Sequence, residues 1–227
     1  MTKHIYGITA PMGSGKSTVL ELLKKHGFET IDTDKLSKQL LIEHSSYIMK
    51  LFPECVSYEI INTKFEPVEY FDLKKYADII FTNDTKRKMM EDFIYPLLFK
   101  KINKIINTTD NIIFIESAIL FETNMDKFIN FESVIYIWTD YALRIKKVLD
   151  NGKYNKTEFL QRENLQMSIS KKMSLANVFL HNEYDIIKFE QELEKLLRQL
   201  KLKWNIHYRR VINDCSRIDR YVKRDRR

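Results

Sequence analysis

The spacing of apolar residues divides the chain into alternating strand-like and helix-like segments. Short apolar runs at 3–8, 28–31, 111–116, 134–138 and 178–180 have the length and composition of strands. Between them, apolar residues recur at intervals of three and four, as they do in amphipathic helices. The unbroken run at 111–116 suits a central strand that is covered on both faces of a parallel sheet. The pattern therefore predicts an α/β fold with a five-stranded parallel sheet.

The segment between the first strand and the first helix has the sequence APMGSGKS at residues 10–17. Its glycines allow backbone N–H groups to approach phosphate oxygens. Lys16 would reach the β- and γ-phosphates of a nucleotide, and the Ser17 hydroxyl would bind Mg²⁺. Ala10 stands where the G-x-x-x-x-G-K-[ST] pattern has glycine, which is tolerable if its φ is negative. The order of strand, loop and helix favours a phosphate-binding loop over a chance Gly/Ser turn before a helix.

Carboxylates follow the next two strands of the predicted sheet. Asp32 and Asp34 follow the second strand, and Glu116 ends the third. Ligands of open α/β sheets bind at the carboxyl ends of the strands. We expect Asp32 to orient or deprotonate an acceptor hydroxyl, with Asp34 supporting it or capping a helix that begins at Lys35. Glu116 stands where phosphate-loop enzymes keep an acid close to Mg²⁺.

Two segments are predicted to surround this site. The segment 35–107 is too long for a plain crossover and mostly helical in pattern, so we expect a helical cap, with a kink or a helix start at Pro96. The polar segment 150–166 is flanked by Arg144 and Arg162, as in a lid whose guanidinium groups clamp phosphates. A solvated helix face is the alternative for these arginines.

Composition adds limits on the class of protein. The 227 residues are 44% hydrophobic and 30% charged, and no apolar run or signal-like N-terminus points to a membrane, so we expect a cytoplasmic protein. Its two cysteines and five histidines lack metal-ligand spacing. The excess positive charge lies in residues 201–227, with ten Lys and Arg against three Asp and Glu. This extension is either a solvated or disordered tail or a contact for nucleic acid or an acidic partner.

With these motifs in place, the chain resembles the dephospho-coenzyme A kinase family over about residues 3–200. Ile8-Thr9 with the sequence GSGKST at 13–18 is similar to the family's opening, and IDTDKL at 31–36 is similar to its second-strand signature. YPLL at 95–98 resembles a His-Pro segment of the family's cap. LFE at 120–122 is the most distinctive match, because other phosphate-loop kinases of small molecules do not usually carry it.

The resemblance implies a three-layer phosphate-loop (P-loop) kinase fold. Its nucleotide-binding core would comprise 1–34 and 108–200, with a lid at about 145–167, a cap for the acceptor at 35–107 and the basic extension at 201–227. The implied reaction is transfer of the γ-phosphoryl group of ATP to the ribose 3′-hydroxyl of dephospho-coenzyme A. The products would be coenzyme A and ADP, in the last step of coenzyme A biosynthesis. We expect a monomer or a weak homo-oligomer.

Residue roles follow from the same motifs. Catalysis would rest on Lys16, Asp32 and Arg144. Ser17 and Glu116 would hold Mg²⁺, in the case of Glu116 through a water or directly. The residues expected to bind ATP are Met12, Gly13, Ser14, Gly15, Lys16, Ser17 and Thr18 of the loop, Arg162 of the lid, and Asn182 beside the adenine. The residues expected to bind the acceptor are Asp34, Tyr95 and Leu120.

Three positions depart from the family pattern. Ala10-Pro11 replaces a glycine pair, Tyr95 replaces a histidine, and Leu149 stands where an arginine is common, although Arg162 or Lys147 could compensate for it. Two other functions therefore stay open. One is another phosphate-loop kinase, such as a nucleoside monophosphate kinase. The other is a non-catalytic nucleotide-binding protein whose basic tail recruits nucleic acid.

Overall fold

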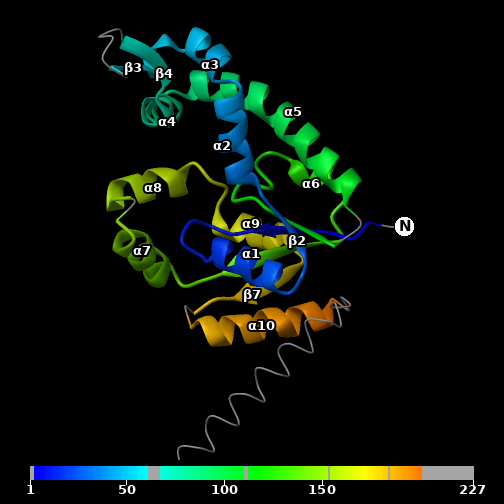
Figure 1. Cartoon of the computed structure of the whole chain (residues 1–227). Coiled ribbons are helices and arrows are strands. Elements are labelled where there is room, and N and C mark those ends of the chain that lie inside the picture. The colour runs from blue at the N-terminus through cyan, green and yellow to red at the C-terminus, as the bar shows by residue number, and fades with distance from the viewer. Residues whose placement is uncertain (1–2, 61–66, 110–111, 153, 184, 201–227) are drawn as a thin grey trace, which may run out of the picture. The chain divides into compact units, whose positions relative to one another are not determined.

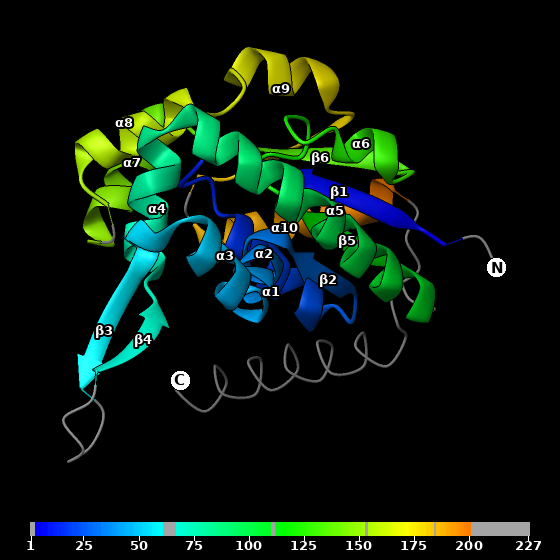
Figure 2. The same cartoon turned by 90° about the horizontal axis from the view of Figure 1, so that it is seen from above.

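The structure is a computed structural model of the chain (Figure 1, Figure 2). It describes residues 3–60, 67–109, 112–152, 154–183 and 185–200. They divide into two compact units: one runs to Asp32 and resumes with the described residues from 112 onward, and the other is Thr33–Thr109. The basic extension at 201–227 lies outside the described residues. Among the helices that the structure does describe, none has the length and apolar character needed to cross a membrane.

The first unit is built on a five-stranded sheet in which every pairing is parallel. Its strands are β1 (Ile5–Thr9), β2 (Glu29–Asp32), β5 (Ile113–Glu116), β6 (Ser133–Trp138) and β7 (Val178–His181). Their order in the sheet is β2-β5-β1-β6-β7, which confirms the predicted five-stranded parallel sheet. The strand order reverses direction at β1, and such a switch point is where open α/β sheets bind ligands.

Helices complete the first unit. They are α1 (Lys16–Lys25), α6 (Met125–Phe128), α7 (Tyr141–Asp150), α8 (Lys156–Asn164), α9 (Ile169–Leu175) and α10 (Ile186–Gln199). The sequence pattern did not predict α9. Figure 1 shows α1 and α10 on one side of the sheet, where their apolar residues share a core with Phe114 and Ile135 of the strands. Ile187, an apolar residue in the first turn of α10, is largely exposed.

The second unit is less helical than the pattern predicts. Its helices are α2 (Thr33–Glu43), α3 (Ser45–Leu51), α4 (Leu73–Thr82) and α5 (Asp84–Thr108), together with the 3₁₀ turn η1 (Pro53–Cys55). An antiparallel pair, β3 (Val56–Ile60) and β4 (Pro67–Phe71), was missed. Each of these strands is only five residues long, so its alternation of apolar and polar residues is a weak signal.

Two helix starts expected in the second unit were wrong. The helix after β2 begins at Thr33 rather than Lys35, so Asp34 lies in its first turn and is not its cap. Pro96 does not begin a helix, because α5 runs through it without a break, and the expected kink stays a prediction. Residues at four-residue spacing keep one face of α5 buried on both sides of the proline: Met90, Ile94, Leu98, Ile102 and Ile106.

The end of α1 contains a buried histidine. His26 follows the last helical residue and donates its backbone N–H to Leu22 O (3.0 Å), and Gly27 then turns the chain with φ +83°. Burial lowers the pKa of His26 below its ordinary value of 6.5, and Lys25 acts in the same direction, whereas Glu190 and Glu194 oppose the shift. His26 is therefore held neutral because the folded state disfavours its charged form.

We predict that His26 makes stability depend on pH. A histidine whose pKa is lowered by folding binds protons more readily in the unfolded state, so its contribution is fully present above pH 6.5 and is lost as the pH falls below that value. Chemical denaturation from pH 8 to pH 5 should show the free energy of unfolding decreasing below about pH 6.5. His26→Gln should flatten this slope, and His181→Gln, at an exposed position, should not. An unchanged slope in His26→Gln would contradict the assignment.

Candidate active site

The carbonyl oxygens of the loop between β1 and α1 accept hydrogen bonds from side chains in four parts of the first unit. Ser14 O accepts from Asn182 Nδ2 (2.9 Å) and from Thr139 Oγ1 (3.3 Å). Met12 O accepts from Arg144 Nη1 (3.1 Å), and Ala10 O accepts from Lys16 Nζ (3.4 Å). Carbonyl oxygens would repel the oxygens of a phosphate. Side chains that donate hydrogen bonds to these carbonyls keep them away from the ligand, so the backbone N–H groups of the loop are available to an anion.

Glycine is required at position 15 by both space and conformation. Gly15 has φ +91°, and a Cβ at this position would lie 2.2 Å from Asn182 Nδ2. Asn182 follows β7 and is buried, so its amide lies against the loop, where it binds Ser14 O. Ala10, which replaces a glycine of the motif, is also buried. Among the described residues other than glycine, only Asn124 has a positive φ, so Ala10 meets the condition for tolerating that replacement.

Two carboxylates lie at the same edge of the sheet as the loop. Glu116 ends β5 and is level with Asp32 on β2 and with Ile8 on β1. Neighbouring strands run about 4.8 Å apart, so Asp32 and Glu116 are adjacent. Glu116 is buried, and its Oε1 lies 3.9 Å from Lys16 Nζ. This is the region at which the sequence motifs predicted phosphate and acceptor to meet.

The residues at this edge fit a divalent cation that is bound together with phosphate. Ser17 is exposed in the first turn of α1, and Glu116 stands one strand away from the strand that leads into the loop. Mg²⁺ commonly takes one or two carboxylates, waters and phosphate oxygens, and does not require a protein cage. The part of the chain that the structure describes contains no cluster of three or more His, Cys, Asp or Glu side chains that could hold a metal.

Arg144 on α7 is completely buried, so the solvated-face alternative is wrong for this residue. Its Nη1 also donates to Glu163 Oε1 on α8 (2.9 Å). The guanidinium lies near two rings, 5.4 Å from the centroid of Tyr141 and 6.0 Å from that of Phe159. Its Nε and Nη2 atoms are buried without a hydrogen-bond partner in the described part of the chain. The arginine is therefore fixed at one nitrogen, with donor capacity left at the other two.

The remaining predicted residues lie in different settings. Arg162 on α8 stacks over the ring of Tyr154, with its guanidinium carbon 4.4 Å from the centroid. Leu120 is completely buried in the turn after β5. In the second unit, Asp34 is exposed, and Tyr95 is half-buried with its ring 6.4 Å from that of Phe99. The roles of these four residues stay predictions.

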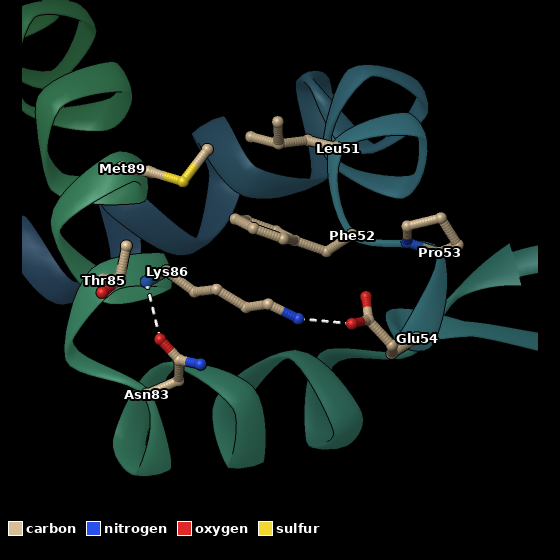
Figure 3. Close-up of a pocket in the computed structure, with 8 residues that line it drawn as sticks. All are labelled: Leu51, Phe52, Pro53, Glu54, Asn83, Thr85, Lys86 and Met89. Carbon is tan, nitrogen blue, oxygen red and sulfur yellow. Dashed lines mark hydrogen bonds and ion pairs between the residues drawn. The ribbon is translucent and has the colours of Figure 1, made fainter.

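The second unit has a cavity of its own, of about 560 Å³ (Figure 3). Its lining is formed by Leu51, Phe52, Pro53, Glu54, Asn83, Thr85, Lys86 and Met89. Figure 3 shows Lys86 extending to Glu54, with which it forms an ion pair, while Asn83 accepts from the Lys86 backbone N–H (3.0 Å). The lysine also lies 5.6 Å from the centroid of the Phe52 ring. No sequence motif pointed to this cavity, because its walls come from segments about thirty residues apart.

The sequence reasoning missed several residues around the loop. Thr139 and Glu163 contact the loop or its arginine, but neither belongs to a motif. Lys172 is buried on α9, the helix that the pattern did not predict. Glu122 was quoted only as part of a family signature, and it pairs with Lys172 (2.9 Å). A charged residue at a helical position gives no sign of burial in a single sequence, so only the fold identifies this group.

Comparisons with known proteins agree on one family. The family model described as dephospho-CoA kinase matches residues 4–188. A dephospho-CoA kinase of Helicobacter pylori strain J99 is 29% identical over 203 residues, which cover 87% of this chain and 98% of that protein. One from Rickettsia prowazekii is 27% identical over 199 residues, covering 86% of this chain and 96% of that protein.

Solved structures give the same result for the fold. The chain matches a dephospho-CoA kinase of Campylobacter jejuni with a TM-score of 0.62 and 25% identity, over 88% of this chain and 98% of that one. A protein of Thermus thermophilus shares the fold with a TM-score of 0.74 at 24% identity, over 88% of this chain and 99% of that one.

We predict that Gly15→Ala disrupts the loop, whereas Gly27→Ala affects only stability. Both glycines have φ near +90°, so either alanine should lower the free energy of unfolding by about 1–2 kcal/mol. A Cβ at Gly27 meets nothing within 4 Å, whereas at Gly15 it displaces Asn182 from Ser14 O. Calorimetric titration with ATP should show lost affinity in Gly15→Ala and near-normal affinity in Gly27→Ala. Equal affinities in the two variants would contradict this account of the loop.

Proposed function

Because the chain belongs to the dephospho-CoA kinase family, we propose that the loop at residues 10–17 holds the phosphates of ATP while Asp32 acts on the ribose 3′-hydroxyl of dephospho-CoA. The family's reaction joins these two substrates, with ATP as the phosphoryl donor. One observation carries the assignment of roles. The strand register sets Asp32 level with Glu116, whose carboxylate lies 3.9 Å from the loop lysine Lys16.

Phosphoryl transfer depends mainly on how the protein positions the reacting groups and stabilises their charge, and little on covalent catalysis by protein side chains. In phosphoryl transfer, charge spreads over the oxygens of the transferred group, and fixed cations and N–H donors stabilise it. Lys16 supplies a cation at the β- and γ-phosphates, and the loop supplies its backbone N–H groups. Asp32 accepts a hydrogen bond from the attacking hydroxyl, aims its lone pair at the γ-phosphorus and takes its proton as the new O–P bond forms. The bond to the β-phosphate oxygen breaks, and ADP leaves.

Mg²⁺ is part of the proposal. The Ser17 hydroxyl and the Glu116 carboxylate are the groups of this chain that would hold it, the latter directly or through a water. When bound, the ion neutralises charge on the β- and γ-phosphate oxygens. Glu116 would then interact with two cations, Mg²⁺ and the ammonium of Lys16, because its Oε1 already lies near that ammonium.

Arg144 is proposed as the lid arginine that contacts the transferred group. A buried N–H without a partner is unfavourable by about 1–3 kcal/mol, and Arg144 has two such nitrogens in the described part of the chain. A phosphate can accept bidentate hydrogen bonds from a guanidinium, so nucleotide would relieve that penalty. Arg162 is proposed as a second phosphate contact from the same lid, which would compensate for Leu149. Asp34, Tyr95 and Leu120 are proposed to contact the acceptor, and Asn182 the adenine.

We predict that Lys16→Ala and Asp32→Asn each lower turnover at least about 100-fold, because general acid–base groups and phosphate-binding cations contribute factors of this size. The assay is ADP release from ATP and Mg²⁺, with dephospho-CoA, AMP, CMP or no acceptor. Wild type should respond only to dephospho-CoA. Asp126→Asn, at an exposed site on α6, is the matched control and should retain activity.

Two outcomes would contradict this proposal. Near-normal turnover in Asp32→Asn or Lys16→Ala, in a protein whose circular dichroism matches wild type, would remove that residue from the mechanism. Release of ADP with AMP or CMP in place of dephospho-CoA would reassign the acceptor to a nucleoside monophosphate.

A further prediction concerns the shape of the group at position 144. Arg144→Lys keeps the positive charge but loses the planar fork, so kcat should fall about 1,000-fold, the lower end of the effect of an arginine on a transferred phosphoryl group. The control is Arg198→Lys, at an exposed pair with Glu194 on α10. Steady-state kinetics should show the loss in kcat. A change confined to the KM for ATP would assign Arg144 to ground-state binding only.

A further inference from the structure

Lys172 is a lysine in an unusual place. It lies on the short helix α9 with only 1% of its surface exposed, and it is one of the largest fully buried side chains of the described chain. Lysine is rarely buried unless its charge is paired, because removing an ammonium from water is unfavourable. Burial accordingly lowers the pKa of Lys172, while Glu122 and Glu163 oppose the shift. Packing alone therefore does not explain why a lysine is buried at this position.

Each of the three ammonium hydrogens has an acceptor available. Lys172 Nζ donates to the backbone carbonyl of Ala118, to Glu122 Oε1 (2.9 Å) and to Gln166 Oε1 (3.1 Å). Glu122 Oε1 also accepts from the backbone N–H of Met167 (2.8 Å). An ammonium has no further donor, so Lys172 is not a site for a ligand anion. It instead joins two segments: the turn at 117–124, and the connection at 165–168 between α8 and α9.

Hydrogen bonds link both segments to the phosphate loop or to the strand that precedes it. The first begins at the residue after Glu116, and Ser117 N donates to Ile8 O on β1 (2.9 Å). The second follows α8, whose Glu163 holds Arg144 Nη1, which in turn donates to Met12 O. Lys172 thus connects the strand end that carries Glu116 to the helix that carries the partner of Arg144.

Charges around the site act on Lys172 as well. The ammonium of Lys16 lowers the pKa of Lys172, and the carboxylate of Glu163 raises it. The buried lysine therefore lies within electrostatic range of the phosphate-loop lysine and of the lid. Its own ion pair is a weak source of stability, because the desolvation of two buried charges offsets most of their attraction. A role in fixing geometry explains the pair better than a role in stability.

We infer that Lys172 is a positioning residue for phosphoryl transfer: with Glu122 and Gln166 it joins the turn after Glu116 to the connection between α8 and α9, and so fixes Glu116 and Arg144 relative to the phosphate loop. This rests on the proposed roles of Glu116 and Arg144. A shift of about 1 Å in such groups lowers the rate about 100-fold. Lys172 itself touches neither substrate nor the reacting atoms.

The test separates positioning from stability with two variants. Lys172→Met keeps the approximate length of the side chain but leaves the Glu122 charge beside an apolar group, so it should lower both the melting temperature and kcat. Lys172→Met combined with Glu122→Gln removes both charges, and the amide oxygen of the new side chain would still accept from the Met167 N–H. The double variant should regain much of the lost melting temperature, while its kcat stays about 100-fold below wild type. Lys171→Met, on the exposed neighbour, is the control and should match wild type.

Activity is measured as ADP release with dephospho-CoA, per mole of folded protein and well below the melting temperature of each variant. A low kcat in the double variant supports the inference. A kcat near wild type in either Lys172 variant overturns it and leaves the lysine a structural role. Wild type and Asp32→Asn are assayed in parallel. An inactive wild type, or an Asp32→Asn variant that is as active as wild type, would count against the proposed function instead.

Discussion

A loop that binds phosphate must present N–H groups to the ligand, and it can do so only if its carbonyl oxygens are bonded elsewhere. In this chain, the hydrogen bonds to the loop carbonyls come from residues that are far from the loop in the sequence. The donors to Ser14 O and Met12 O come from Thr139 after β6, from Asn182 after β7 and from Arg144 on α7. These residues lie more than 120 positions further along the chain. The parallel sheet brings them together, because its strands all end at the same edge.

The same constraint explains why position 10 of the motif can hold alanine while position 15 requires glycine. Ala10 is buried and its φ is not positive, so its backbone conformation does not require glycine. At Gly15 there is no room, since the amide of Asn182 occupies the space that a side chain would need. The two positions of one motif therefore differ because a Cβ at position 15 would collide with the side chain of Asn182, which holds the loop.

Much of this arrangement could be predicted from the sequence, because it depends on local signals. The apolar runs indicated the five strands, and their parallel order followed from the helical segments between them. The order of loop, Asp32 and Glu116 along the chain also fixed their place at one edge of the sheet. The antiparallel pair of β3 and β4, the helix α9 and the helix through Pro96 were missed, because packing rather than local preference decides them.

The contacts between charged side chains could not be predicted. Arg144 and Lys172 look like solvated helix residues in the sequence, yet both are almost completely buried against glutamates. Their partners Glu163 and Glu122 lie 19 and 50 residues away, with no spacing rule that links them. Asn182 was expected at the adenine, and its side-chain amide donates to the loop carbonyl of Ser14.

The most direct test of the loop as the phosphate site is two-dimensional NMR of the ¹⁵N-labelled chain, titrated with a non-hydrolysable ATP analogue. We predict that the backbone amide signals of residues 13–18 shift most, together with the side-chain amide of Asn182, because ligand contact alters the N–H groups of the loop and the side chain that binds its carbonyl. Shifts confined to other parts of the chain, with the loop signals unchanged at saturation, would contradict it.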